Sequence, residues 1–137
     1  MENGLTLTVF TPDHVALAQE AALKTGQNVD VHLKLDTGMN RIGVKDEAAL
    51  GEILRRIQGC PGIRLTGAFT HFASADNPDP SQTDRQLERF RQLTSLLPPD
   101  LLLHTSGSSA LLTRPDARFG MVRAGLALYG YAGVDSP

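Results

Sequence analysis

The amino-acid sequence predicts an α/β fold of parallel strand–helix units, and three observations support that prediction. Short apolar runs of strand composition alternate with longer segments in which apolar residues recur at helical spacing. Capping and stop residues mark the ends of the helical segments. The order strand, helix, strand repeats along the chain, as in parallel βα units. A doubly wound sheet and a (β/α) barrel share this order, so the pattern by itself leaves both architectures open.

The first expected strand–helix unit lies near the N-terminus. LTLTVF, residues 5–10, has the Leu, Thr, Val and Phe content that is typical of a strand. Thr11 and Pro12 then provide an N-cap and a proline at the first helical position. We expect this helix to continue to about Lys24 and to stop at Gly26, because glycine favours the left-handed conformation that ends helices.

The second unit follows the same plan. VDVHLKLD, residues 29–36, is the expected strand, and Asp46 is placed to cap the helix after it. The apolar residues of this helix recur at helical spacing: Leu50, Ile53, Leu54 and Ile57. Gly59 should end the helix.

The rest of the chain carries three further expected strands, at residues 63–73, 101–104 and 121–130. A helix from about Ser81 should stop at Pro98-Pro99, because proline cannot continue a helix. A short helix is expected at residues 108–113. No change in composition marks a second domain, so we treat residues 1–137 as one domain.

Composition narrows the functional classes. The length of 137 residues suits a single domain, and 41% hydrophobic and 20% charged residues are ordinary for a globular protein. A net charge of -2 gives no basic patch, which argues against nucleic acid as a partner. The single Cys60 excludes an internal disulfide and favours a reducing compartment. No apolar run approaches a membrane span and no basic signal-peptide start is present, so we expect a cytoplasmic protein without membrane contact.

The second expected strand has one apolar and one polar face. Val31, Leu33 and Leu35 share one parity, whereas His32, Lys34 and Asp36 share the other. Buried parallel strands are usually apolar on both faces, and an unpaired buried charge costs several kcal/mol. We therefore expect the polar face to open onto a polar interior, at the carboxyl ends of the strands where α/β proteins bind their ligands.

The other expected strands also end in polar residues. The candidate site consists of Lys34, Arg41, His71, Ser108 and Arg123. Solvated strand-end side chains are the simpler reading of each residue alone, and for His71 or His104 taken singly that reading is favoured. Their repetition at the same end of consecutive strands favours a shared site.

HTSGSS, residues 104–109, lies between a strand and a short helix, so its backbone N–H groups and hydroxyls can face an anion. Gly125 allows a second close approach after the last expected strand, and loops after the final barrel strands often hold phosphate. With Arg123 nearby, a phosphorylated ligand is expected. A nucleotide is not, since GxxxxGK[ST] and GxGxxG motifs are both missing.

Four segments together, VHLKLDTGMNRIGV, GAFTHFASAD, HTSGSSA and MVRAGLALYG, are similar to the pyridoxal-phosphate-dependent alanine racemases of fold-type III. The similarity extends from about Leu5 to Gly130. It implies a homodimeric, cytoplasmic isomerase that interconverts L- and D-alanine and supplies D-alanine for cell-wall peptidoglycan. It also implies a (β/α)8 TIM barrel followed by a β-rich domain. The five expected strands would be barrel strands 4–8, and residues 1–137 would form part of the barrel domain.

The resemblance implies roles for individual residues. Arg41 would bond the phenolic oxygen of pyridoxal 5'-phosphate, and Arg123 would face its pyridine nitrogen. Because a guanidinium cannot act as an acid near neutral pH, it would leave that nitrogen unprotonated and favour racemisation over side reactions. His71 would pack against the cofactor and support Arg123. The expected phosphate contacts are Ser108 and the backbone N–H groups of Gly125 and Leu126.

Lys34 matches a lysine that is carbamylated in some family members. Two cations, Lys34 and Arg41, would repel each other, whereas a carbamate on Lys34 would be an anion able to hold Arg41. Asp36 is the alternative counter-charge. Two positions depart from the family pattern: Gly107 stands where asparagine is frequent, and Ala124 where proline is common. Neither removes a charge, so both bear on affinity more than on the reaction.

Two parts of the family's machinery do not match this sequence. The Schiff-base lysine belongs to a motif like VKANAYGHG, and Lys24 and Lys45 lie in the wrong context to replace it. The opposing catalytic tyrosine belongs to the C-terminal domain, and we assign it to neither Tyr129 nor Tyr131. We therefore read the chain as a fragment and expect that alone it does not racemise alanine.

Three other interpretations account for part of this pattern. A racemase of broader or serine specificity would share the fold and the motifs. A non-catalytic pyridoxal-phosphate-binding barrel is disfavoured by the run from Asp36 to Met39, because carriers of that kind lack it. An unrelated phosphate-binding (β/α) protein would explain Ser108 and Gly125 but not Lys34 and Arg41.

Overall fold

The computed structural model describes residues 4–131, which contain a four-stranded, all-parallel sheet. The strands are β1 (Leu7–Val9), β2 (Val29–Lys34), β3 (Ile63–Phe69) and β4 (Leu102–His104). Their order in the sheet is β1-β2-β3-β4, the same as in the sequence. A doubly wound sheet needs a reversal of strand order, whereas a barrel adds each strand to the same edge. The expected parallel α/β fold is confirmed, and its strand order is that of an arc of a (β/α) barrel.

The expected fifth strand at residues 121–130 is wrong. Its first half is irregular backbone, and Leu126–Tyr129 form a short 3-10 helix, η2. A strand needs a neighbour in register, but the backbone N–H of Arg123 reaches only Ser106, beyond the end of β4. The third expected strand is also shorter than its apolar run, because β3 ends at Phe69.

Four α-helices follow the strands in order: α1 (Pro12–Thr25), α2 (Glu47–Gln58), α3 (Ser81–Thr94) and the short α4 (Ser108–Thr113), with a 3-10 turn, η1 (Pro115–Ala117), after them. The predicted caps are confirmed. The side chain of Thr11 accepts from the N–H of His14 at 3.2 Å, and Asp46 accepts from Ala49 at 2.8 Å. Gly26 ends α1 in the left-handed conformation, with φ of 65°. Among residues 4–131, no helix is both long and apolar enough to cross a membrane.

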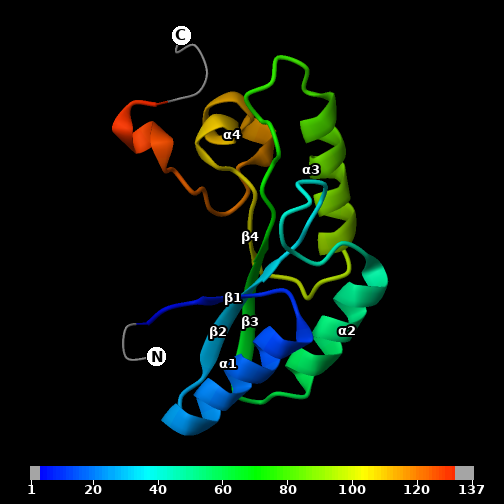
Figure 1. The fold of residues 1–137 in the computed structure, drawn as a ribbon, viewed down its shortest axis with the longest axis vertical. Helices are drawn as coiled ribbons and strands as arrows, with labels where there is room; N and C mark the ends of the chain where they lie inside the picture. The colour runs from blue at the N-terminus through cyan, green and yellow to red at the C-terminus, as the bar shows by residue number, and fades with distance from the viewer. Residues whose placement is uncertain (1–3, 132–137) are drawn as a thin grey trace.

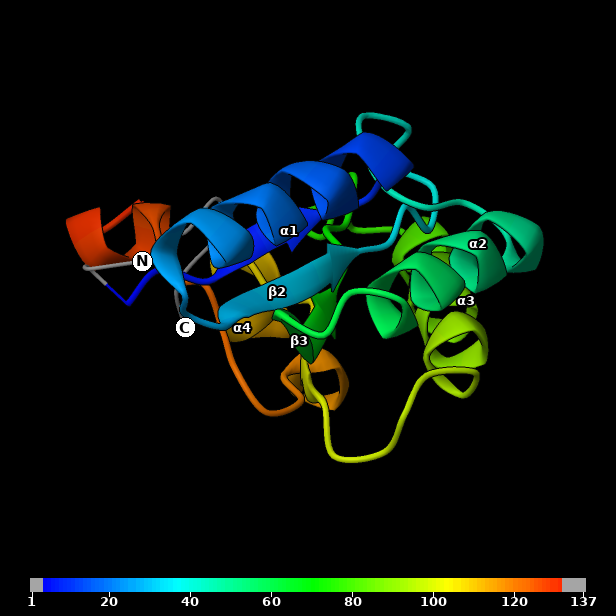
Figure 2. The ribbon, with the colours of Figure 1, turned by 90° about the horizontal axis from the view of Figure 1, so that it is seen from below.

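The main core lies between the sheet and the first three helices. Right-handed crossovers between parallel strands place successive helices on the same face, and Figure 2 shows α1, α2 and α3 following one another around one side of β2 and β3. Val15, Leu50 and Phe90 come from these three helices and are buried in one cluster with Val31 and Leu33 of β2. Burial of this apolar face stabilises the arc and fixes which parity of each strand faces away from the helices.

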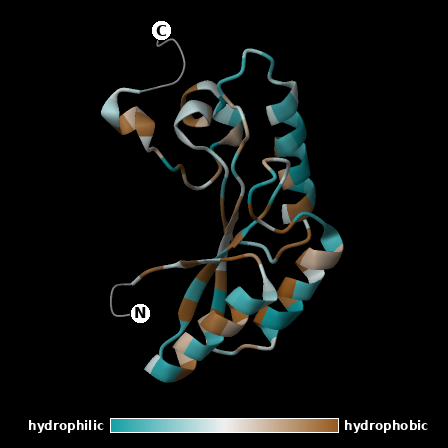
Figure 3. Ribbon diagram, in the orientation of Figure 1, coloured by the Kyte–Doolittle hydropathy of each residue, from teal (hydrophilic) through white to brown (hydrophobic). Residues whose placement is uncertain are grey.

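The opposite face of the sheet is polar, as the alternation in β2 predicts. Lys34 is only 3% exposed although it belongs to this face. Phe69 of β3 stacks on His104 of β4, with ring centroids 4.7 Å apart and planes within 6°. Figure 3 shows hydrophilic and hydrophobic residues alternating along the strands, whereas η2 is a largely apolar segment that projects from the rest.

Candidate functional site

The side chains singled out from the sequence lie where β2, β3 and β4 end. Lys34 is the last residue of β2 and Arg41 follows in the next loop, His71 lies two residues beyond β3, and Ser108 opens α4 just after β4. In Figure 1 these strand ends lead up to the region of α4. The sheet thus brings residues far apart in the sequence to one end of the fold.

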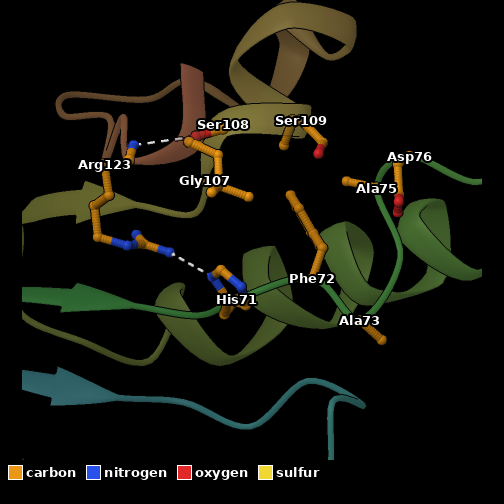
Figure 4. A pocket seen from close by; sticks show the side chains of 12 residues that line it. His71, Phe72, Ala73, Ala75, Asp76, Gly107, Ser108, Ser109 and Arg123 are labelled. Carbon is orange, nitrogen blue, oxygen red and sulfur yellow. Dashed lines mark hydrogen bonds between the residues drawn. The ribbon is translucent and has the colours of Figure 1, made fainter. Parts of the chain in front are cut away.

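A cavity of about 310 Å³ opens at this end of the sheet. Its walls include most of the expected cofactor contacts: His71, Ser108, Arg123, Gly125 and Leu126. In Figure 4, Arg123 and His71 point toward each other at one side of the cavity, while Asp76 lies at the opposite side. A cavity of this size is at the lower end of the range for small-molecule sites, roughly 300–1,000 Å³.

Arg123 is the centre of the hydrogen-bond network. Its Nη1 lies 2.7 Å from Nδ1 of His104, and its Nη2 donates to the carbonyl oxygens of Thr70 at 2.8 Å and Thr105 at 3.0 Å. Nη2 is also 3.2 Å from Nδ1 of His71. All these partners are neutral, and none of the ion pairs between residues 4 and 131 involves Arg123. Its positive charge is therefore available to an anion.

His71 joins the cavity wall to Arg123. Because a guanidinium only donates hydrogen bonds, Nδ1 of His71 must accept, which places the ring proton on Nε2. Burial lowers the pKa of His71, and the nearby charge of Arg123 lowers it further. Gly107 leaves room for this ring, since a Cβ at that position would lie 3.2 Å from Cε1 of His71. His71 is thus held as a neutral acceptor beside the cavity.

Ser108 and the backbone after Arg123 meet at the same cavity. Oγ of Ser108 accepts from the N–H of Gly125 at 3.0 Å and of Ala127 at 3.1 Å. Ser108 and the N–H of Gly125 are both expected to contact a phosphate, whereas here they bond to each other. The hydroxyl proton of Ser108 remains a donor for a ligand, and Leu126 completes this wall.

Lys34 is a buried ammonium that bonds no carboxylate of residues 4–131. Its Nζ donates to the carbonyl oxygens of Leu35 at 2.7 Å and Ile42 at 3.3 Å, and it lies 5.7 Å from the centre of the Phe69 ring. Burial lowers the pKa of Lys34 to about 8, although the charge of Asp36 opposes the shift. A fraction of Lys34 is therefore uncharged and nucleophilic near neutral pH.

Asp36 does not serve as the hydrogen-bonded counter-charge of Lys34. Its Oδ1 accepts from the N–H groups of Gly38 at 3.1 Å and Asn40 at 3.0 Å, and its Oδ2 is 3.9 Å from Nζ of Lys45. These contacts close the loop that carries Arg41. Asp36 therefore shapes the loop, and its alternative role as partner of Lys34 does not match the hydrogen bonds.

Arg41 stands apart from the rest of the site. It is exposed, and within the described part of the chain it forms neither a hydrogen bond nor an ion pair. Its charge nevertheless acts on both Lys34 and His71, whose pKa values it lowers. The structure thus brings His71, Ser108 and Arg123 to one cavity, whereas neither Lys34 nor Arg41 is among its lining residues.

Sequence reasoning missed two members of the network. His104 looks like an ordinary strand-end histidine, yet it contacts Arg123 directly and is only 3% exposed. His32 lies behind it, with its Nδ1 2.9 Å from Nε2 of His104. The available signal was the polar parity of β2, which His32 shares with Lys34.

The residues present fit a small phosphorylated ring compound. Arg123 is a partly buried cation that pairs with no carboxylate in the described part of the chain, Ser108 offers a hydroxyl, and His71 offers a flat imidazole at the wall of the cavity. No cluster of three or more His, Cys, Asp or Glu that could bind a metal ion occurs between residues 4 and 131. The donor set thus favours an anionic organic cofactor.

Comparison with known proteins gives one consistent family. A family model described as the alanine racemase N-terminal domain matches residues 1–133. An alanine racemase of Chlorobaculum tepidum is 40% identical over 140 residues, covering 99% of this chain and 36% of that protein. The structure of alanine racemase from Clostridium difficile 630 has a TM-score of 0.86 at 35% identity, over 93% of this chain and 34% of that one.

A histidine racemase from Leuconostoc mesenteroides subsp. sake has a similar structure, with a TM-score of 0.87 at 30% identity, over 97% of this chain and 36% of that one. The curated relatives are much longer than this chain, which spans about a third of their length.

Proposed function

We propose, from the premise that the chain belongs to the alanine racemase family, that it forms a cofactor-binding part of an enzyme that interconverts L- and D-alanine. The observation that carries the proposal is the convergence of Arg123, His71 and Ser108 on one cavity at the carboxyl ends of parallel strands. Such an enzyme would work in the cytoplasm as a homodimer and supply D-alanine for the cell wall.

The cofactor we propose is pyridoxal 5'-phosphate. When bound, it supplies an electron-withdrawing ring that makes the proton on the substrate Cα acidic. Ser108, together with the backbone of Gly125 and Leu126, would hold the phosphate, because these groups line the cavity beside the charge of Arg123. Arg41 would reach the phenolic oxygen from the loop after β2. His71 would pack against the ring.

Arg123 would face the ring nitrogen of the cofactor. Its guanidinium stays protonated near neutral pH, so it donates a hydrogen bond but transfers no proton. Carbonyl oxygens of Thr70 and Thr105 and the imidazoles of His71 and His104 fix its plane. An unprotonated ring nitrogen withdraws fewer electrons, which favours return of the proton to Cα over side reactions.

Lys34 is proposed to carry a carbamate. Its pKa, lowered by burial to about 8, leaves a fraction of free amine that can attack carbon dioxide, with loss of one proton from Nζ. The product would be an anion close to the charges of Arg41 and Arg123. Intact-mass measurement in bicarbonate buffer, or density beyond Nζ, tests this proposal, and a bare ammonium under both conditions would refute it.

The position within the barrel is also part of the proposal. We place β1 to β4 as the fourth to seventh strands of a (β/α)8 barrel, with residues 121–130 at the position of the eighth. Residues 1–137 would then be a part of the barrel domain. The support is the unbroken order β1-β2-β3-β4 and the likeness to racemase structures over 93% of the chain.

The test is a chimera in which this chain replaces the matching segment of the Chlorobaculum tepidum alanine racemase. The purified chimera should contain pyridoxal 5'-phosphate and form D-alanine from L-alanine. Arg123→Leu in the chimera should lower kcat/KM by about tenfold or more, a loss of at least 1.4 kcal/mol of transition-state stabilisation. Arg64→Leu, which removes an exposed arginine of β3, is the matched control.

The choice of alanine as substrate needs a test of its own, because the fold is as similar to that of a histidine racemase as to that of an alanine racemase. The same chimera should therefore be assayed with L-alanine, L-serine and L-histidine. Preference for serine or histidine would overturn the substrate, and a folded, cofactor-containing chimera that racemises none of the three would overturn the function.

A further inference from the structure

We propose that His32 and His104 form a chain of two neutral imidazoles that fixes the orientation of Arg123, which makes His32 a positioning residue. The chain crosses the polar face of the sheet. Nδ1 of His32 on β2 lies 2.9 Å from Nε2 of His104 on β4, and Nδ1 of His104 lies 2.7 Å from Nη1 of Arg123. Both contacts have hydrogen-bond distances.

The direction of every hydrogen bond follows from the arginine. A guanidinium has only donors, so Nδ1 of His104 must accept and its proton must sit on Nε2. That Nε2–H then donates to His32, whose Nδ1 must accept in turn. His32 therefore also carries its proton on Nε2. Because Arg123 can only donate hydrogen bonds, it determines the tautomers of both His104 and His32.

The surroundings hold both rings in place. A Cβ on Gly67 would lie 2.6 Å from Nε2 of His32, so the imidazole rests directly on the glycine backbone of β3. Phe69, two residues further along β3, stacks on His104, and Arg123 lies 5.3 Å from the centre of the same phenyl ring. The strand between the two histidines therefore supplies both the space and the stacking surface for the chain.

Burial keeps both imidazoles neutral, and at His104 the charge of Arg123 adds to its effect. Burial and then the charge of Arg123 lower the pKa of His104 to about 4, with a smaller effect of His32 in the same direction. Burial also lowers the pKa of His32, against the opposing charge of Asp30 on its own strand. A proton on Nδ1 of His104 would remove the acceptor and place a cation against the guanidinium.

A fixed guanidinium would be held ready for a bound cofactor ring, and this benefit rests on the proposed function. The hydrogen-bond chain itself does not depend on the proposed function. His32 is not among the residues that line the cavity, and within residues 4–131 it forms no hydrogen bond to Arg123, so it acts on the guanidinium through His104. Leucine at position 32 would leave the buried Nε2–H of His104 without an acceptor, whereas asparagine would keep a side-chain acceptor close to the position of Nδ1.

Long-range proton–nitrogen NMR correlation on the ¹⁵N-labelled chain at pH 7.5 tests the inference. His32 and His104 should each show an unprotonated Nδ1 and a protonated Nε2. His32→Leu should shift the Nε2–H resonance of His104 and speed the exchange of this proton with solvent, because the proton loses its acceptor. His32→Asn should retain the wild-type signal, and His14→Asn, which removes a ring on α1, should leave it unchanged.

A protonated Nδ1 at His104 in the wild-type chain would overturn the inference, and so would an unchanged His104 signal in His32→Leu. The spectra need no cofactor. If they agree with expectation while the chain fails to bind pyridoxal 5'-phosphate, the proposed function fails and the histidine chain stands.

Discussion

At the scale of single residues, the site depends on how one buried charge is accommodated. Arg123 is surrounded by two imidazoles and two carbonyl oxygens rather than by a carboxylate. A carboxylate would neutralise the guanidinium and compete with an anionic ligand. Neutral acceptors orient the guanidinium without neutralising its charge. This arrangement requires that His71 and His104 stay unprotonated.

This arrangement predicts that the chain loses stability in acid because of His104. The pKa falls from an ordinary 6.5 to about 4 in the folded chain, so between these values the unfolded chain binds a proton that the folded chain does not. The contribution of neutral His104 is fully present above pH 6.5 and is lost as the pH falls towards 4. It amounts to about 3 kcal/mol.

Urea unfolding at several pH values between 4 and 7 measures this effect. His104→Gln removes the titrating ring, so the free energy of unfolding of this variant should vary less steeply over the same interval. An equal slope in both proteins would contradict the assignment of neutral His104 to the folded chain.

At the scale of elements, a bulge in β3 determines which residues of this strand face the helices and which lie on the polar face of the sheet. Val31 pairs with Leu65 but His32 pairs with Gly67, which leaves Thr66 as an extra residue on β3. After this bulge, Ala68 lies beside Leu33 in the core, while Gly67 lies under the ring of His32. Without it, the alternation of β3 would turn the wrong residues toward the helices.

A matched pair of glycine substitutions tests the importance of this contact. Gly67→Ala would place a Cβ 2.6 Å from Nε2 of His32 and 2.6 Å from the carbonyl oxygen of Leu102. The backbone atom cannot rotate away, so we expect a loss of about 1–3 kcal/mol in the free energy of unfolding. Gly51→Ala, inside α2 with open space around it, should instead stabilise the chain by about 0.5–1 kcal/mol.

Chemical denaturation of the two variants and the wild type gives both numbers. Equal changes in the free energy of unfolding at the two positions would contradict the claim that a side chain at position 67 clashes with His32 and Leu102.

Local signals explain which elements were predictable. The caps at Thr11 and Asp46 act on N–H groups three residues away, so the starts of α1 and α2 can be predicted from the sequence alone. Residues 121–130 have strand composition but form no strand, because pairing depends on neighbours that composition does not describe.

The same distinction holds for the site. His71 and Ser108 could be placed at one end of the sheet because parallel strands all end there, whereas Arg123 was expected in a strand that does not form. The contact between His32 and His104 joins residues 72 positions apart and depends on the bulge in β3. Gly67, an isolated glycine in the strand, is compatible with a bulge but does not show which residue is the extra one.

At the scale of the whole molecule, the described arc leaves apolar surface and strand edges uncovered. β1 pairs only with β2, and β4 only with β3, within residues 4–131. In η2, Leu126, Leu128 and Tyr129 are 64%, 76% and 79% exposed. Bare edges and clustered apolar side chains promote association between chains.

We therefore expect the chain to associate as its concentration rises, which sedimentation velocity can measure. Leu128→Lys should reduce this association, since it places a charge within the apolar segment. Leu17→Lys on α1, where the native residue is 63% exposed, is the matched control and should have little effect. A monomer at all concentrations, or equal effects of the two lysines, would contradict this expectation.

The central claim is that groups from neighbouring parallel strands bind one phosphorylated ring compound at a common end of the sheet. Calorimetric titration of the chain with pyridoxal 5'-phosphate, and with pyridoxal lacking the phosphate, tests it most directly. We predict saturable binding of the phosphorylated form, competition by inorganic phosphate, and affinity about tenfold or more weaker in Arg123→Leu and Ser108→Ala, whereas Arg64→Leu leaves it unchanged. A folded chain that binds neither compound, or binds both equally well in every variant, would contradict the account.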